Sequence, residues 1–404
     1  MNATADIDAQ AIVAPRDPIH AVTYRDPYPY YARLVAETPF YRDETLGLWV
    51  ASDAQTVDAV LHSDLCRVRP LAEPVPKALV GSPAGEIFRH LVRMNDGEGH
   101  CPFKQAVSAT LNALDTARVT AEGARWAARL ASGIGAEMAP PHLTEFAFAL
   151  PAYVIATLLG APDASVPDIA RLVGELVRGF APASTPEQLT SGGAAAARLL
   201  ELFRDDMRRS SGSDDSLLLS LAVQARRFGR DDAAVVIANA IGFMTQAYEA
   251  TAGLIGNALL ALAVLPDVHQ RLRASPAILG QVLEEILRYD SPVQNTRRFL
   301  AEDGMVAGQA MKQGDTILVI LAAANRDPSA NTDPHRFDET RRDRRTFTFG
   351  AGLHACPGQL LATTIAAAGV NALLGRGVDP ARLDPHPPYR PSANVRIPLL
   401  ASLP

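Results

Sequence analysis

The chain has 404 residues, of which 48% are hydrophobic, and its formal net charge at pH 7 is −6. Such an acidic chain is poorly suited to bind nucleic acid or an anionic membrane surface, so we expect its main ligand to be a small molecule. The three cysteines, Cys66, Cys101 and Cys356, are too few and too scattered for a disulfide framework or a zinc site, which favours the reducing cytoplasm.

The domain organisation is predicted to be simple. Residues 1–15 lack the basic start and apolar core of a signal peptide, and we interpret them as a disordered tail. Chains of this length often form two or three domains. No stretch of the remainder has the character of a linker, so we expect residues 16–404 to form a single domain.

The first predicted elements are a short helix, a hairpin and an irregular segment. Residues 26–34 favour the helix, and the short apolar runs on either side of the turn at 43–47 favour the hairpin. Four prolines between Arg69 and Gly85 predict that this segment forms no regular element, as is common where a chain lines a binding site.

A cationic pair opens the next predicted helix. His100 and Lys104 are four residues apart, so they share one face of the helix and can bind the same acidic group. Three further helices are predicted at residues 143–159, 168–180 and 187–209, and a proline-flanked loop joins the last two.

The longest apolar stretch covers residues 231–265 and contains Glu249. It exceeds the roughly 20 residues that span a bilayer. Several polar residues lie inside it, however, and a glutamate in the middle of a span is costly in lipid. We therefore predict a long helix buried in protein and no membrane segment.

Two charged motifs and a strand region follow the long helix. Glu285 and Arg288 lie one turn apart on a predicted helix, a spacing that by itself is common in surface ion pairs. The segment 333–338 contains Arg336, and residues 305–321 alternate and turn as strands do.

The most specific motif is the decapeptide Phe349-Gly350-Ala351-Gly352-Leu353-His354-Ala355-Cys356-Pro357-Gly358. Its glycines permit a tight loop around a buried sulfur, and the apolar run after it predicts a helix whose N-terminus lowers the pKa of a thiol. A structural cysteine after a glycine-rich turn is the simpler alternative. The whole pattern, F-G-x-G-x-H-x-C-x-G, resembles the haem-thiolate loop of cytochromes P450.

This resemblance extends from about residue 26 to residue 404. The region around Glu249, the E-x-x-R motif formed by Glu285 and Arg288, and the Arg336 segment follow one another in the order of the family. It implies the cytochrome P450 fold, which is mainly α with a small β region. It also implies haem b, bound between the long helix and the cysteine loop, with the Cys356 thiolate as axial ligand of the iron.

The resemblance implies further roles around the cofactor. The residues implied to contact the haem propionates are His100, Lys104, His354 and Arg298, with Arg297 as an alternative to Arg298. The residues implied to shape the loop are Phe349, Gly350 and Gly358, and those implied to fix it through a buried network are Glu285, Arg288 and Arg336. Lys104 replaces the arginine usual in the family and lacks its bidentate fork.

The oxygen-activation pattern departs from the family at one position. Glu249 keeps the acid, but Ala250 stands where the family has a threonine whose hydroxyl assists proton delivery. Shifting the alignment to use Thr251 would turn that hydroxyl about 100° around the helix. We hypothesise that Gln246, on the same face as Ala250, supplies part of the lost hydrogen bonding. A bond from Gln246 to neighbouring backbone is the alternative, and a substrate hydroxyl or carbonyl is another source.

Two features next to the loop concern electron transfer. Pro357 has no N–H to donate to the sulfur, which leaves the thiolate more electron-rich and predicts a lower iron potential. Four arginines precede the loop, where the family docks an acidic electron donor, namely Arg341, Arg342, Arg344 and Arg345. An ordinary solvated loop is the alternative for these arginines.

The resemblance implies a monooxygenase that inserts one oxygen atom from dioxygen into a small, moderately hydrophobic organic substrate of secondary metabolism, free or bound to a carrier protein. A ferredoxin or flavodoxin-type donor with its reductase would supply electrons. Ala250 leaves open a peroxide-driven peroxygenase or an oxidative coupling or desaturation, although the long helix offers no arginine to anchor a fatty acid. A catalytically silent module that recruits a carrier protein is an alternative of another class, and the intact Cys356 argues against it.

Overall fold

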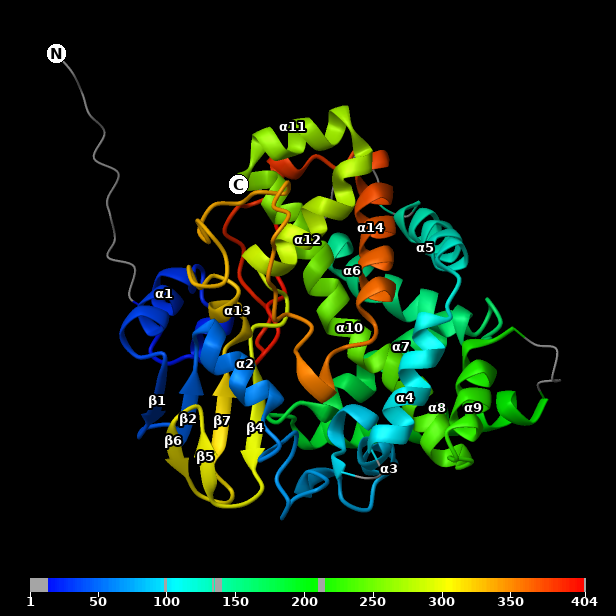
Figure 1. Ribbon diagram of the computed structural model, residues 1–404. Coiled ribbons are helices and arrows are strands. Elements are labelled where there is room, and N and C mark those ends of the chain that lie inside the picture. The colour runs from blue at the N-terminus through cyan, green and yellow to red at the C-terminus, as the bar shows by residue number, and fades with distance from the viewer. Residues whose placement is uncertain (1–13, 98–99, 133, 135–139, 210–214, 403–404) are drawn as a thin grey trace.

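The computed structural model describes residues 14–97, 100–132, 134, 140–209 and 215–402. The predicted disordered tail, residues 1–15, lies almost wholly outside this part of the chain. Helices form one side of the molecule and a small sheet with α1 and α2 forms the other (Figure 1). The prediction of a mainly α fold with a small β region is confirmed.

The α-helices are α1 (Tyr28–Glu37), α2 (Ala54–His62), α3 (Pro83–His90), α4 (His100–Asn112), α5 (Thr116–Ala131), α6 (Pro140–Leu158), α7 (Val166–Phe180), α8 (Pro186–Arg209), α9 (Leu217–Arg227), α10 (Ala233–Val264), α11 (Pro266–Ala274), α12 (Leu279–Tyr289), α13 (Leu321–Ala324) and α14 (Gln359–Gly375). Two 3-10 turns matter for the site, η3 (Val92–Met94) and η6 (Gly352–His354). All the helices predicted from the sequence are present, with ends shifted by a few residues.

The strands are β1 (Phe40–Asp43), β2 (Leu48–Ala51), β3 (Cys66–Arg67), β4 (Thr296–Leu300), β5 (Gly304–Val306), β6 (Gln309–Met311) and β7 (Thr316–Val319). The first sheet has the order β1-β2-β7-β4-β3, in which only β2 and β7 run parallel, and β5 pairs with β6 in a separate hairpin. The β1–β2 hairpin confirms the prediction for this region.

The prediction that no regular element forms between Arg69 and Gly85 was wrong at its C-terminal end. Helix α3 begins at Pro83, and the Ser82 hydroxyl caps it by accepting a hydrogen bond from the Gly85 N–H at 3.1 Å. Proline suits the first turn of a helix because its φ angle is already helical and its missing N–H would have no partner there. Here Pro83 therefore starts a helix.

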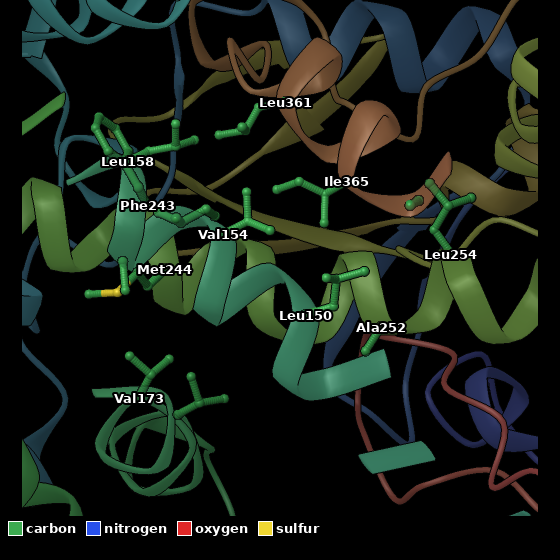
Figure 2. Close-up of a cluster of buried hydrophobic side chains, with 14 of the residues drawn as sticks. Leu150, Val154, Leu158, Val173, Phe243, Met244, Ala252, Leu254, Leu361 and Ile365 are labelled. Atoms are coloured by element: carbon green, nitrogen blue, oxygen red, sulfur yellow. The ribbon is translucent and has the colours of Figure 1, made fainter. Parts of the chain in front are cut away.

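Helix α10 runs through the protein core and meets several other helices. It contacts α6, α12 and α14, and α14 also packs against α6. Figure 2 shows Leu361 and Ile365 of α14 pointing toward Leu150 and Val154 of α6. Gly369 permits this close approach, because a Cβ atom at that position would lie 2.8 Å from Leu150 Cδ2.

By length and composition, α10 is the one helix among those described that is apolar enough to cross a membrane. In its most apolar window, 61% of the residues are buried inside the protein. This burial agrees with the prediction of a long core helix.

Candidate functional site

The middle of α10 opens onto an accessible space. Residues 236–245 and 251–260 are buried without exception, whereas residues 246–250 between them are partly or fully accessible. A break of this kind in the centre of a core helix means that the surrounding side chains leave this turn of it incompletely covered. The uncovered segment contains Gln246, Glu249 and Ala250, the three positions that the sequence assigned to oxygen activation.

Glu249 lies beside a guanidinium from the C-terminal part of the chain. Its Oε1 is 3.5 Å from Arg390 Nη2, and the Arg390 guanidinium lies 4.9 Å from the centre of the Phe148 ring. Burial raises the pKa of Glu249, while the charges of Arg390 and Arg93 act to lower it. The carboxyl group is therefore held partly desolvated, as an internal proton carrier requires.

Ala250 and Thr251 have different surroundings. Ala250 is partly accessible, whereas Thr251 is 1% exposed and its hydroxyl has no hydrogen-bond partner within the described chain. Thr251 therefore does not replace the missing hydroxyl at the opening. The Gln246 side chain is accessible, and its amide donates a hydrogen bond to the Gly242 carbonyl at 2.8 Å. This is the backbone bond considered as the alternative, and it leaves the amide oxygen available.

The cysteine loop is held by its own backbone. Gly350 and Gly352 have φ angles of 68° and 65°, a region that favours glycine. The Cys356 N–H donates to the Phe349 carbonyl at 2.8 Å, and the Gly358 N–H donates to Cys356 Sγ at 3.4 Å. The sulfur thus has one backbone donor, and Pro357 supplies none.

The Cys356 side chain is accessible, yet burial raises the pKa of its thiol. Both observations hold for a sulfur that opens onto a space enclosed by protein. The Gly358 N–H and the Lys104 ammonium act to lower this pKa. Desolvation acts in the opposite direction and is the larger effect in the polypeptide. Helix α14 begins only at Gln359, and the lowering of the thiol pKa by the helix start stays a prediction.

Two histidines and an aspartate gather beside the loop. The rings of His100 and His354 are 4.4 Å apart, and His354 Nε2 lies 2.9 Å from Asp96 Oδ1. Burial, with the charges of His354 and Lys104, lowers the pKa of His100 to about 4. Buried His100 Nε2 has no partner in the described chain. An orphaned buried nitrogen of this kind fits an acidic group of a ligand.

Arg298 and Lys104, two of the cations implied for the propionates, have no carboxylate partner among the described residues. Arg298 is 5% exposed, and its guanidinium bonds only to Thr296 and the Arg297 carbonyl within the described residues. Lys104 Nζ instead donates to the Ala355 carbonyl at 2.5 Å. An unpaired buried guanidinium is costly, so a bound dianion such as haem fits this site.

Glu285 and Arg288 form a buried ion pair. Both side chains are 0% exposed, and Glu285 Oε1 lies 2.6 Å from Arg288 Nη2. The third partner differs from the prediction. Arg336 is exposed and contributes only its carbonyl, whereas Arg344 Nε donates to Glu285 Oε2 at 2.9 Å. The turn after Phe337 carries the chain back over α12 and brings this later arginine to the carboxylate.

Asn325 connects this ion pair to the cysteine loop. Its carbonyl accepts from Arg288 at 3.3 Å, and its side-chain oxygen accepts from the Phe347 N–H at 2.6 Å. Its amide nitrogen donates to Thr348 Oγ1 at 2.9 Å. No local sequence pattern indicates this role for Asn325, because its partners are distant in sequence and only the fold brings them together.

The arginines before the loop do not form one surface patch. The Arg341 and Arg344 side chains are 7% and 10% exposed and face Glu285. Arg342 is exposed, and Arg345 lies 3.1 Å from Asp58. Of the four arginines predicted to form a basic patch, only Arg342 and Arg345 are exposed.

We expect Pro357→Leu to raise the ferric/ferrous potential of the haem-loaded protein. The substitution supplies an N–H beside the sulfur, and one more hydrogen bond stabilises the thiolate by about 1 kcal/mol. For one electron this corresponds to about 40 mV. Spectroelectrochemical titration measures the shift. Pro357→Ala adds the same N–H without the bulk of leucine in the groove lined by Leu360 and Leu361, so it should give a similar shift. Unchanged potentials in both variants would refute the argument.

Comparison with known proteins finds relatives that match nearly the whole length of the chain. A family profile described as Cytochrome P450 matches residues 196–376. The chain is 31% identical to 6-deoxyerythronolide B hydroxylase of Saccharopolyspora erythraea, over 89% of this chain and 90% of that enzyme. It is 26% identical to the biotin biosynthesis cytochrome P450 of Bacillus subtilis, over 87% of this chain and 89% of that protein.

Solved structures give the same fold. The crystal structure of CalO2 has a TM-score of 0.82 and 28% identity, covering 96% of this chain and 98% of that one. P450BioI, solved in complex with an acyl carrier protein ligated to hexadec-9Z-enoic acid, has a TM-score of 0.80 and 26% identity, covering 93% and 97%.

Proposed function

The chain belongs to the cytochrome P450 family of haem-thiolate monooxygenases, and from this premise we propose that it inserts one oxygen atom of dioxygen into a small, moderately hydrophobic organic substrate of secondary metabolism. The observation that carries the proposal is the geometry of the cysteine loop. Cys356 has an accessible side chain, and its sulfur accepts a hydrogen bond from the Gly358 N–H at 3.4 Å. A sulfur in this setting is suited to bind iron as a thiolate.

We assign haem b to this site. Cys356 would bind the iron through its thiolate, and the residues that would hold the propionates are His100, His354 and Arg298. When bound, the haem supplies the activation of dioxygen. Arg298 would neutralise propionate charge, and the unpartnered His100 Nε2 would donate a hydrogen bond to the propionate carboxylate. Asp96 orients His354 by its 2.9 Å contact with Nε2. Lys104 is the least direct of the predicted contacts, since it bonds the Ala355 carbonyl.

Glu249 is proposed to carry protons to the uncovered segment of α10. Burial raises the pKa of Glu249, so the carboxyl group retains a proton to higher pH than an exposed glutamate does. Arg390, 3.5 Å away, fixes the orientation of the carboxyl group. With no hydroxyl at Ala250, the final transfer to the reacting oxygen depends on the Gln246 amide, a substrate hydroxyl or carbonyl, or a water held by either.

We expect Gln246→Leu to increase the release of peroxide per NADH consumed and to slow product formation. The change removes the polar group nearest to Ala250 on the same helix face, so protons reach the opening less efficiently. Ala250→Thr is the matched variant, because it adds a hydroxyl one turn away and should decrease peroxide release. Peroxide and product are quantified in one reconstituted reaction. Unchanged coupling in Gln246→Leu would refute the role of Gln246.

Separate proteins are proposed to supply the electrons, and the protein is proposed to act in the cytoplasm as a soluble enzyme. A ferredoxin or flavodoxin-type donor with its reductase fits the exposed Arg342, which precedes the cysteine loop, and Leu353 within that loop, which is 64% exposed. The acyl carrier protein complex of P450BioI favours a carrier-bound substrate as a second candidate for the substrate form.

Two measurements test the proposed function. The reduced protein with carbon monoxide should give the absorption band of a thiolate-bound haem. Turnover with a surrogate ferredoxin and its reductase should then exceed turnover with peroxide alone. The reverse order would identify a peroxygenase, and absence of the thiolate band would overturn the assignment of Cys356.

A further inference from the structure

A short turn places one arginine close to the uncovered segment of α10. The turn η3 contains Arg93 and is tied to α10 by Asn239, whose side chain accepts from the Val92 N–H at 2.8 Å and donates to the His90 carbonyl at 2.7 Å. Leu91, which is 0% exposed, packs so closely on α10 that a Cβ atom on Gly242 would lie 2.7 Å from its Cδ2. The backbone beside Arg93 is therefore held against the core helix.

The Arg93 guanidinium has no hydrogen bond or ion pair with any residue that the structure describes. Its side chain is accessible, yet burial lowers its pKa.

The charged neighbours of Arg93 separate it from the propionate residues. Glu249 is the charge that acts to raise the pKa of Arg93. The charges that act to raise the pKa of Arg298 are instead those of Cys66 and Asp96. The charge that acts to raise the pKa of Lys104 is that of Cys356. Val92 and Leu91, which flank Arg93, contact Asn239 and Gly242 of α10, whereas Lys104 bonds to the Ala355 carbonyl of the cysteine loop. Arg93 therefore lies on the α10 side of the site.

Among the described residues, two positive charges act on the Glu249 carboxylate, those of Arg390 and Arg93. The Glu249 carboxylate already has a partner, Arg390, at 3.5 Å. Two guanidinium groups thus face a single carboxylate, and desolvating the second guanidinium without an anion is unfavourable. Aromatic surface lies beside these charges, since the Arg390 guanidinium is 4.9 Å from the centre of the Phe148 ring, and the Tyr248 ring is 5.0 Å from that of Phe148.

Building on the proposed function, we propose that Arg93 anchors the carboxylate of the substrate, which is a monocarboxylic acid with an apolar body. A planar guanidinium matches a carboxylate with two parallel hydrogen bonds. The apolar part of the acid would lie along the Phe148 and Tyr248 rings and over residues 246–250. Although α10 has no arginine of its own, this turn brings one to it.

The test compares ligands that differ only in charge. Haem-loaded protein is titrated with dodecanoic acid, dodecanamide, phenylbutanoic acid and phenylbutanamide, and binding is followed by the haem spin-state band and independently by calorimetry. The wild-type protein should bind one of the acids about tenfold to a hundredfold more tightly than its amide. Arg93→Gln should remove this preference, and Arg93→Lys should keep part of it. Arg89→Gln, which changes an exposed arginine on α3, should leave it unchanged.

Three results would overturn the proposal. Equal binding of acid and amide by the wild-type protein would exclude a carboxylate site. Binding only of an acyl group tethered to carrier protein would favour the carrier-bound substrate instead. Loss of haem in Arg93→Gln, with normal haem content in Arg89→Gln, would assign Arg93 to a propionate. The carbon monoxide band of the wild-type protein, measured alongside, tests the proposed function separately.

Discussion

Glu285→Ala is expected to yield a protein that does not incorporate haem and unfolds at a much lower temperature. Glu285 is 0% exposed and accepts hydrogen bonds from Arg288, Arg344 and the Asp338 N–H. Removing it leaves Arg288, also 0% exposed, as a buried charge without its carboxylate. Breaking a buried pair in this way costs roughly 3–5 kcal/mol, a large part of the ~5–15 kcal/mol that stabilises a typical domain.

The effect should reach the cofactor through Asn325. Arg288 donates to the Asn325 carbonyl, and the Asn325 side chain holds Phe347 and Thr348 just before the cysteine loop. Haem content per protein and the midpoint of thermal unfolding are the measurements. Glu284→Ala is the control, because the Glu284 side chain is 58% exposed and pairs with Arg344 at the surface. A stable, haem-containing Glu285→Ala protein would contradict this account.

The same network predicts that substitutions of Arg344 and Arg336 have different effects on haem content. Arg344→Ala should lower haem content, since the Arg344 guanidinium contacts the Glu285 carboxylate at 2.9 Å. Arg336→Ala should leave haem content nearly unchanged, since only the Arg336 carbonyl takes part. Equal losses in both variants would restore the original assignment of Arg336.

Cys356→Ala is expected to remove the carbon monoxide band of thiolate-bound haem and to reduce dioxygen-dependent turnover by more than about 100-fold. Even residues that only support a metal ligand cost about 10–100-fold in activity when changed, and the ligand itself should cost more. The loop should keep its shape, because backbone bonds such as Cys356 N–H to Phe349 O hold it. The sulfur itself accepts one weak bond.

Cys101→Ala is the matched control for this substitution. Cys101 is an exposed free cysteine on α4, next to His100, so its loss should change neither the band nor turnover. Thermal unfolding of the haem-free proteins shows whether Cys356→Ala still folds. Retention of a thiolate band in Cys356→Ala would mean that another cysteine binds the iron, and the proposed function would need a different site.

The sequence alone determined the features that depend on residues close together along the chain. The decapeptide around Cys356 is contiguous, so its glycine turns and its cysteine could be interpreted directly. Glu285 and Arg288 are three residues apart on one helix, so their pairing followed from helical geometry. Apolar periodicity likewise predicted most helices and the core position of α10.

Only the tertiary structure decided which distant side chains meet. Arg336 and Arg344 lie a few residues apart, and the path of the chain after Phe337 selects Arg344 as the partner of Glu285. Arg390 reaches Glu249 from the C-terminal region, and Arg93 is held against α10 by the turn before α4. Local patterns report contacts within one helical turn or strand pair, whereas packing joins residues separated by more than a hundred positions. The anchoring arginine proposed for the substrate therefore came from the fold.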